Sequence, residues 1–270
     1  MPMLPVYLFM GVILVVMIAA WAVQKMRRRA GVLNVRHFAL PPGWLKILRE
    51  NVPLYNRMPL GLRERMQDAV INFVDGRRWK HCGGLESVTA EMKVTIAAQA
   101  CFLMLARVGQ PNFARIHNVM IYPKSSLTAP EDSENALPPV DAWPSATVVL
   151  VWDDERKTAL DLRDEHNGVL RDFAARLNPG EGGLPASSVW RHTPWARAMT
   201  EQFVRHAENG PQAALPLPEP QTDEETGEFF AAATELFFEL PDRLRSRNAE
   251  LYALLRSFFK LDPVKWQPAR

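Results

Sequence analysis

The sequence is poor in cysteine and nearly balanced in charge. Its 270 residues include two cysteines, Cys82 and Cys101, which show neither a CxxC pattern nor the density of a disulfide scaffold, so both are expected to stay reduced. The formal net charge is +2, and the basic residues are scattered apart from one cluster near the N-terminus. This balance argues against a nucleic-acid partner. An apolar content of 47% with 23% charged residues is typical of a folded protein.

The two cysteines have different neighbours in the sequence. Cys101 stands in the apolar run "AQACFLML" and is expected in the core. Cys82 follows His81 in "KHCGGLE", where a reactive thiol or one half of a weak metal site stays open beside an ordinary structural role.

The first thirty residues contain a run with the length of a transmembrane helix. Residues 4–23, "LPVYLFMGVILVVMIAAWAV", carry no charge, and about 20 apolar residues cross the hydrocarbon layer of a membrane. Lys25 and the three arginines ending at Arg29 follow directly, whereas no charged side chain precedes the run. Because basic flanks stay in the cytoplasm, we expect a single-pass protein of the inner (cytoplasmic) membrane, with its N-terminus outside and the C-terminal domain in the cytoplasm.

A cleaved signal peptide is the alternative for this run, since Ala20-Trp21-Ala22 mimics a small-x-small cleavage site. The lack of a basic region before the run, its length, and the positive charge after it favour the membrane anchor. The expected organisation is a short N-terminal tail (1–3), the anchor (4–23), a basic flank and linker (24–43), a folded domain (44–263) and a C-terminal tail (264–270).

Helical periodicity dominates the folded domain. Residues 61–79 place apolar side chains at helical spacing opposite charged ones. Residues 87–105 are almost wholly apolar after Ser or Thr caps ahead of Glu91, which predicts a buried central helix. Further helices are predicted at 165–178, 188–209, 223–241 and 248–263.

Two short runs rich in branched residues interrupt the helical pattern. Residues 116–122 and 146–152 have strand character, and the proline-rich stretch 125–144 between them is predicted to be a long surface loop. A second proline-rich stretch, 211–220, cannot be helical. The fold class is therefore α+β, mostly helical, with a small sheet from the middle of the chain.

Several segments, in this order along the chain, resemble one protein family. "EMKVTIAAQAC", "VVLVWDD", "HNGVLRDFAARLN" and "GEFFAAATELFFELP" are similar to segments of the Mlc titration factor A family of zinc-dependent peptidases, and the likeness covers Trp44 to Pro263. The resemblance implies a zincin-like metallopeptidase domain. It also implies that active members of the family use a zinc cofactor.

In that family one helix carries His-Glu-x-x-His, whose histidines bind zinc while the glutamate acts as general base on the metal-bound water. A glutamate on a later helix completes the protein ligands. The resemblance places the first histidine at Arg171, the general base at Asp172 and the second histidine at Ala175. It retains the third ligand as Glu228 and puts Gln221 where the family has a tyrosine.

These replacements remove the donors that zinc needs. Arginine stays protonated and offers no lone pair, and alanine has no donor at all. Asp172 would have no activated water to work on. We therefore expect no zinc cofactor and no catalytic residues. The histidines of the chain offer no replacement pair, because no two are spaced i, i+3 or i, i+4: His37, His81, His117, His166, His192 and His206.

Arg171 and Glu228 suggest an ion pair. If the family fold is kept, the two side chains face each other across the former metal site, and a charge-assisted pair could take over the structural role of the metal. The alternative is that Arg171 turns outward into solvent and Glu228 contributes only to a helix N-terminus.

The aromatic residues near Arg171 and Glu228 in the sequence have two possible roles. Phe229, Phe230, Phe237 and Phe238 could form a peptide-binding wall, but their helical spacing favours core packing. Trp190 and Trp195 could line a cleft or serve as a cap or core residues.

Together these observations predict a membrane-anchored pseudopeptidase that binds a protein or peptide partner. By family resemblance, one candidate partner class is a transcriptional regulator of sugar uptake, although partner choice depends on surfaces that a motif does not describe. An active metallopeptidase with non-standard ligands is the alternative function, and a purely structural membrane protein is a third.

Overall fold

The computed structural model leaves the N-terminal 39 residues outside its description, and with them the predicted membrane anchor 4–23. Among the helices that it does describe, none is both long enough and apolar enough to cross a membrane. The described residues all belong to one structural unit of the chain. They are 40–106, 113, 116–130, 132–139, 146–152, 167–177, 194–209, 217 and 225–266.

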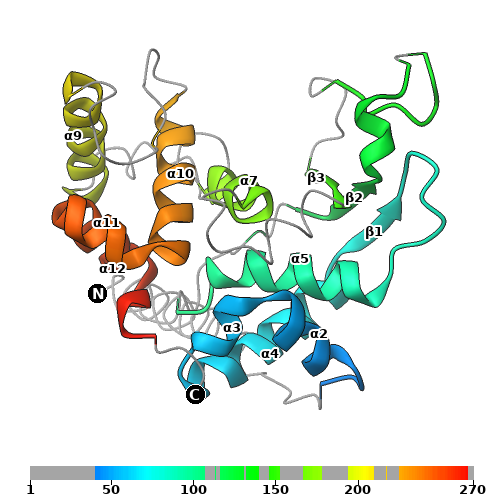
Figure 1. The fold of residues 1–270 in the computed structure, drawn as a ribbon, viewed down its shortest axis with the longest axis horizontal. Coiled ribbons are helices and arrows are strands. Elements are labelled where there is room, and N and C mark those ends of the chain that lie inside the picture. The colour runs from blue at the N-terminus through cyan, green and yellow to red at the C-terminus, as the bar shows by residue number, and fades with distance from the viewer. Residues whose placement is uncertain are drawn as a thin grey trace, which may run out of the picture. The chain divides into compact units, whose positions relative to one another are not determined.

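Helix α5 (Ala90–Phe102) is the central element of the N-terminal half. Thr89 caps it as predicted, because its side chain accepts a hydrogen bond from the backbone N–H of Met92 at 3.2 Å. Ten of its thirteen residues are buried, so the helix is apolar on almost every side. Figure 1 shows α5 lying across three N-terminal helices, of which the first and third pack directly on it: α2 (Trp44–Asn51), α3 (Pro53–Arg57) and α4 (Leu60–Asp75).

The sheet has three parallel strands in the order β1 (Arg78–His81), β2 (Asn118–Tyr122) and β3 (Thr147–Val151). Helix α5 lies between β1 and β2 in the chain, which gives a β-α-β unit. Val119 of β2 aligns with Trp79 on one side and Val148 on the other. The side chains of β3 are buried except at its last residue, as expected of a short strand in a covered parallel sheet.

The structure confirms two of the strands and corrects the N-terminal boundaries. The runs 116–122 and 146–152 contain β2 and β3. The helix predicted over 61–79 ends at Asp75, because the chain leaves the helix at Gly76 and continues as β1. The predicted loop 125–144 begins with a short 3-10 helix, Lys124–Leu127.

The C-terminal half is helical. Helix α10 (Glu225–Glu239) packs against α7, α9, α11 and α12, so it is the core element of this half. Each of the predicted ranges 165–178, 188–209, 223–241 and 248–263 contains a helix in its described residues, and α11 is an addition. The elements are α7 (Gly168–Leu177), α9 (Pro194–Asn209), α11 (Pro241–Arg247), α12 (Ala249–Phe259) and the 3-10 helix η4 (Pro263–Lys265).

The phenylalanines of α10 form the aromatic core of this half. Phe229, Phe230, Phe237 and Phe238 are each at most 2% exposed. Phe259 of α12 packs against the last two, with ring centroids 5.7 and 5.2 Å away. The core interpretation is therefore confirmed, and these rings are not available as a peptide-binding wall.

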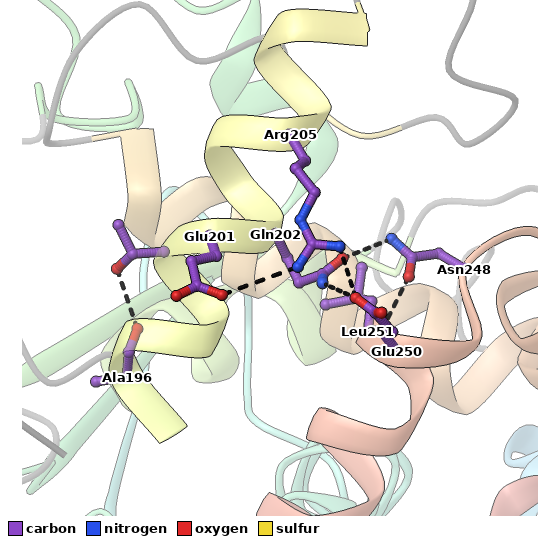
Figure 2. Close-up of polar contacts among 8 residues, drawn as sticks. Ala196, Glu201, Gln202, Arg205, Asn248, Glu250 and Leu251 are labelled. Atoms are coloured by element: carbon purple, nitrogen blue, oxygen red, sulfur yellow. Dashed lines mark hydrogen bonds and ion pairs between the residues drawn. The ribbon is translucent and has the colours of Figure 1, made fainter. Parts of the chain in front are cut away.

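Helix α9 is held against α12 by polar contacts (Figure 2). Glu250 accepts hydrogen bonds from Gln202 at 2.8 Å and from Arg205 at 2.6 Å. Asn248 caps α12 and also donates to Gln202 at 2.9 Å. Because Arg205 and Glu250 are largely exposed, their ion pair stabilises the contact only weakly.

Apolar contacts secure the N-terminal end of α9. The ring of Trp195 stacks on Phe258 with centroids 4.6 Å apart, and its indole N–H donates to the backbone oxygen of Leu254 at 3.0 Å. Trp195 therefore serves as a packing residue, and Trp190 lies outside the described residues.

Candidate functional site

Helix α7 begins at a buried asparagine that joins three helices. The Asn167 side-chain oxygen accepts from the backbone N–H of Leu170 at 3.0 Å, which caps α7. Its amide nitrogen donates to Gln99 of α5 at 3.2 Å and to Glu239 of α10 at 2.9 Å. Asn167 is fully buried, so all of these bonds form away from water. The start of α7 is thereby fixed relative to both neighbouring helices.

A second carboxylate of α10, Glu235, lies beside the same helix start. It is 2% exposed and accepts a hydrogen bond from the backbone N–H of Asn167. Its other oxygen lies 4.0 Å from Nη1 of Arg171, one turn further along α7. The guanidinium and the backbone N–H therefore contact different oxygens of one buried carboxylate.

The burial of Glu235 changes its acidity. Removal from water raises the pKa of this carboxyl from 4.5 to about 7, while the Asn167 N–H bond and the Arg171 charge pull the pKa downward. Desolvation is the largest of these effects. Glu235 is therefore partly protonated near neutral pH, even with a guanidinium next to it.

The two sides of α7 differ in burial. Phe173 and Ala174 are fully buried, and the Phe173 ring meets those of Phe73 and Phe113 edge-on. The face carrying Arg171, Asp172 and Ala175 is only half-buried. The arginine side chain keeps 33% of its surface accessible. The expected site positions thus share the accessible side of a helix whose other side is anchored in the core.

Arg171 has a different carboxylate partner from the one that the sequence suggested. Glu228 lies in the first turn of α10 and is exposed, whereas Glu235 lies two turns later and is buried. Residues seven apart on an α-helix share a face but are about 10 Å apart along the axis. The ion pair of Arg171 is formed with the buried glutamate.

Comparison with known proteins identifies the family of the chain. The profile of the glucose-regulated metallo-peptidase M90 family matches residues 23–260. The chain belongs to this family. The resemblance inferred from the sequence motifs is therefore confirmed over nearly the whole folded domain.

One similar protein is from Synechocystis sp. and is described as the uncharacterized protein slr2042. It is 27% identical, with 83% of this chain and 86% of the relative covered. The match extends over most of both chains.

The residues present do not fit the zinc ion that the family name implies. Arg171 and Ala175 stand at the expected histidine positions, and neither has a lone pair to offer a metal. The Arg171 guanidinium also brings a fixed positive charge to the site, beside the carboxylate of Glu235. Within the described ranges there is no group of three or more His, Cys, Asp or Glu residues arranged to hold a metal ion.

The other residues considered from the sequence are spread over the fold. Cys101 is buried in the core, as predicted, and Cys82 is half-buried after β1. His81 contacts the backbone oxygen of Leu85 at 2.8 Å and His206 contacts that of Leu217 at 3.2 Å. Gln221, His37, His166 and His192 lie outside the described residues.

Sequence reasoning missed Glu235, Glu239 and Gln99. A signal was present, because Glu228, Glu235 and Glu239 fall on one face of a predicted helix at intervals of seven and four. A carboxylate inside an apolar helix needs a buried partner. Asn167, near the start of the helix predicted at 165–178, was an available amide.

Proposed function

We propose that this chain is a membrane-anchored pseudopeptidase, in which the M90 fold is retained as a module that binds a protein or peptide. The observation that carries this proposal is the Arg171 guanidinium at the first histidine position, 4.0 Å from the carboxylate of Glu235. A protonated arginine repels a divalent cation and cannot ligate it. Asp172 then has no metal-bound water to deprotonate.

The membrane part of the proposal rests on the uncharged run 4–23 and the basic residues that follow it. The family match begins at residue 23, where this run ends. That order supports an anchor followed directly by the family domain, and the basic flank favours the cytoplasmic side for the domain. Fractionation and protease accessibility of the full chain in membranes test this topology.

The binding partner is proposed to be a protein or peptide that contacts the half-buried face of α7. By family resemblance, a transcriptional regulator is one candidate. Charge reversal of Asp172 to Lys should weaken binding of such a partner, whereas the same reversal at exposed Glu201 of α9 should not. If both variants bind the partner equally well, the partner contacts a surface other than the half-buried face of α7.

Restoration of the family residues tests the loss of metal chemistry. We expect the triple variant Arg171→His, Asp172→Glu, Ala175→His to bind zinc in a calorimetric titration in which the unmodified chain shows no binding. The added Glu228→Gln change should then remove that binding. Zinc binding by the unmodified chain would instead support the alternative function, an active metallopeptidase with non-standard ligands.

A further inference from the structure

A cavity of about 300 Å³, with no residue of α7 in its described lining, lies between α4 and the residues that follow α5. Its apolar lining includes Phe73, Met104 and Leu105. Two arginines, Arg65 and Arg77, also line it. This combination of an apolar wall and two cations is unlike the α7 site, where carboxylates dominate. We call this space the Arg77 cavity.

Arg77 is fixed in place by its contacts. Its guanidinium carbon lies 4.6 Å from the centroid of the Phe73 ring, in a cation–π contact. Nη2 donates to the backbone oxygen of Phe113 at 3.2 Å, and Nη1 donates to that of Gly76 at 3.4 Å. Nε is buried and has no hydrogen-bond partner in the part of the chain that the structure describes. The charged group is thus held rigidly and partly removed from water.

The positive charge of Arg77 has no counter-ion among the described residues. Burial lowers the pKa of the guanidinium, and the Cys101 thiol is the group that opposes this effect; no carboxylate contributes. The guanidinium nevertheless stays protonated at accessible pH. A desolvated charge without a partner is unfavourable, so proteins normally pair it with an anion.

The C-terminus of α4 compensates this charge only in part. Arg77 follows the helix by two residues and binds the carbonyl of Gly76, as a C-terminal cation commonly does. The helix end supplies about half an elementary charge, and Arg65 adds a second cation to the same cavity. Among the described residues that line the cavity there are thus two cations and no carboxylate.

We propose that the Arg77 cavity binds a small organic carboxylate. The carboxylate contacts Arg77 and Arg65, whose planar N–H groups match its two oxygens. The apolar part of the ligand packs against Phe73, Met104 and Leu105. The volume lies at the lower end of the range for small-molecule sites, which suits a single ring or a short alkyl chain. A bare inorganic anion would leave the apolar wall uncovered.

The test uses the purified full-length chain and three probes in a calorimetric or NMR titration. Benzoate carries both the charge and the ring, benzamide carries the ring alone, and inorganic phosphate carries the charge alone. We expect benzoate to bind at least about tenfold more tightly than either of the other two. Equal affinity for benzoate and benzamide, or for benzoate and phosphate, would overturn the proposal.

Two variants locate the site. Arg77→Met should weaken benzoate binding by about tenfold or more. Arg78→Met removes the same charge from the next residue, which is exposed on β1, and should leave binding unchanged. If Arg77→Met does not fold, benzoate binding is tested with Arg65→Met and with the three-probe comparison on the unmodified chain. Benzoate binding that survives both cavity substitutions would place the carboxylate elsewhere.

Discussion

The Nη1 atom of Arg171 lies 4.0 Å from the carboxylate of Glu235, a residue only 2% exposed to solvent. The same carboxylate accepts the backbone N–H of Asn167, so one buried acid holds both the start of α7 and its first arginine. We propose that Arg171, at a position where the family resemblance expects a metal-binding histidine, supplies a positive charge to this buried acid in a domain that has lost its metal. This is the central claim of our account.

Removal of the Arg171 charge should destabilise the domain. We expect Arg171→Met to lower the free energy of unfolding by about 1 to 2 kcal/mol, because Glu235 loses its cation while the partly exposed arginine forms only a loose pair. Chemical denaturation of the full chain measures this. The matched control is Arg197→Met, an exposed arginine of α9, which should change stability by less than about 0.5 kcal/mol.

The double variant Arg171→Met, Glu235→Gln separates the pair from general damage. If the two residues stabilise each other, the double variant should be more stable than the sum of the single changes implies. Additive losses would mean that Arg171 and Glu235 do not interact energetically.

The pH dependence of the free energy of unfolding should reflect the titration of Glu235. Its pKa is about 7 in the folded chain and near 4.5 without burial, so the folded state holds a proton that the unfolded state releases between these values. Its contribution to stability is full below pH 4.5 and is lost as the pH rises through about 7. The free energy of unfolding, measured by chemical denaturation, should differ less between pH 5.5 and pH 8 in Glu235→Gln than in the unmodified chain. If the variant and the unmodified chain show the same pH dependence, Glu235 does not titrate as a buried acid with a raised pKa.

Asn167 and Asn248 offer a matched comparison of two capping residues. Each accepts a backbone N–H at 3.0 Å, from Leu170 and Leu251 respectively. Asn167 is fully buried and also bonds Gln99 and Glu239, whereas Asn248 is half-buried. We expect Asn248→Ala to cost about 1 kcal/mol and Asn167→Ala about 3 kcal/mol or more. Equal losses in thermal denaturation would show that the buried network adds nothing to the cap.

The attachment of α9 should depend on Trp195 more than on the polar contacts in Figure 2. Trp195→Ala removes the stacking on Phe258 and the bond to Leu254, at a cost of about 2 to 4 kcal/mol. Glu250→Ala breaks an ion pair with Arg205 that is exposed to water and screened by salt, together with one part-buried bond from Gln202. Hydrogen exchange of the α9 amides should accelerate much more in the tryptophan variant. Faster exchange in Glu250→Ala would reverse this ranking.

Much of the fold could be predicted from local patterns. The apolar run of α5 and its Thr89 cap located the central helix, and the branched residues of β2 and β3 located two strands. Strand β1 was missed because its four residues are mostly polar and follow an amphipathic helix without a proline between them. Its strand conformation comes from pairing with β2, which is a tertiary contact that periodicity does not contain.

The candidate site was predicted only in part. Position-by-position resemblance selected Arg171, Asp172, Ala175 and Glu228, but the partner of Arg171 depends on which turn of α10 packs against α7. The helix pair brings Glu235 and Asn167 together across 68 residues of sequence. Such a contact is set by packing of the two helices, and the sequence alone supplied only the shared face of the glutamates.

The metal content of the purified full-length chain is the sharpest test of whether this domain has lost its metal site. Elemental analysis after purification without chelator, with added zinc as a second sample, should find far less than one zinc per chain in both. That result would support a domain without its metal, in which Arg171 is paired with Glu235 and stands where the family has a metal-binding histidine. Stoichiometric zinc that is lost in Glu228→Gln would contradict this account, because it would mean that the chain holds the family's metal with other ligands.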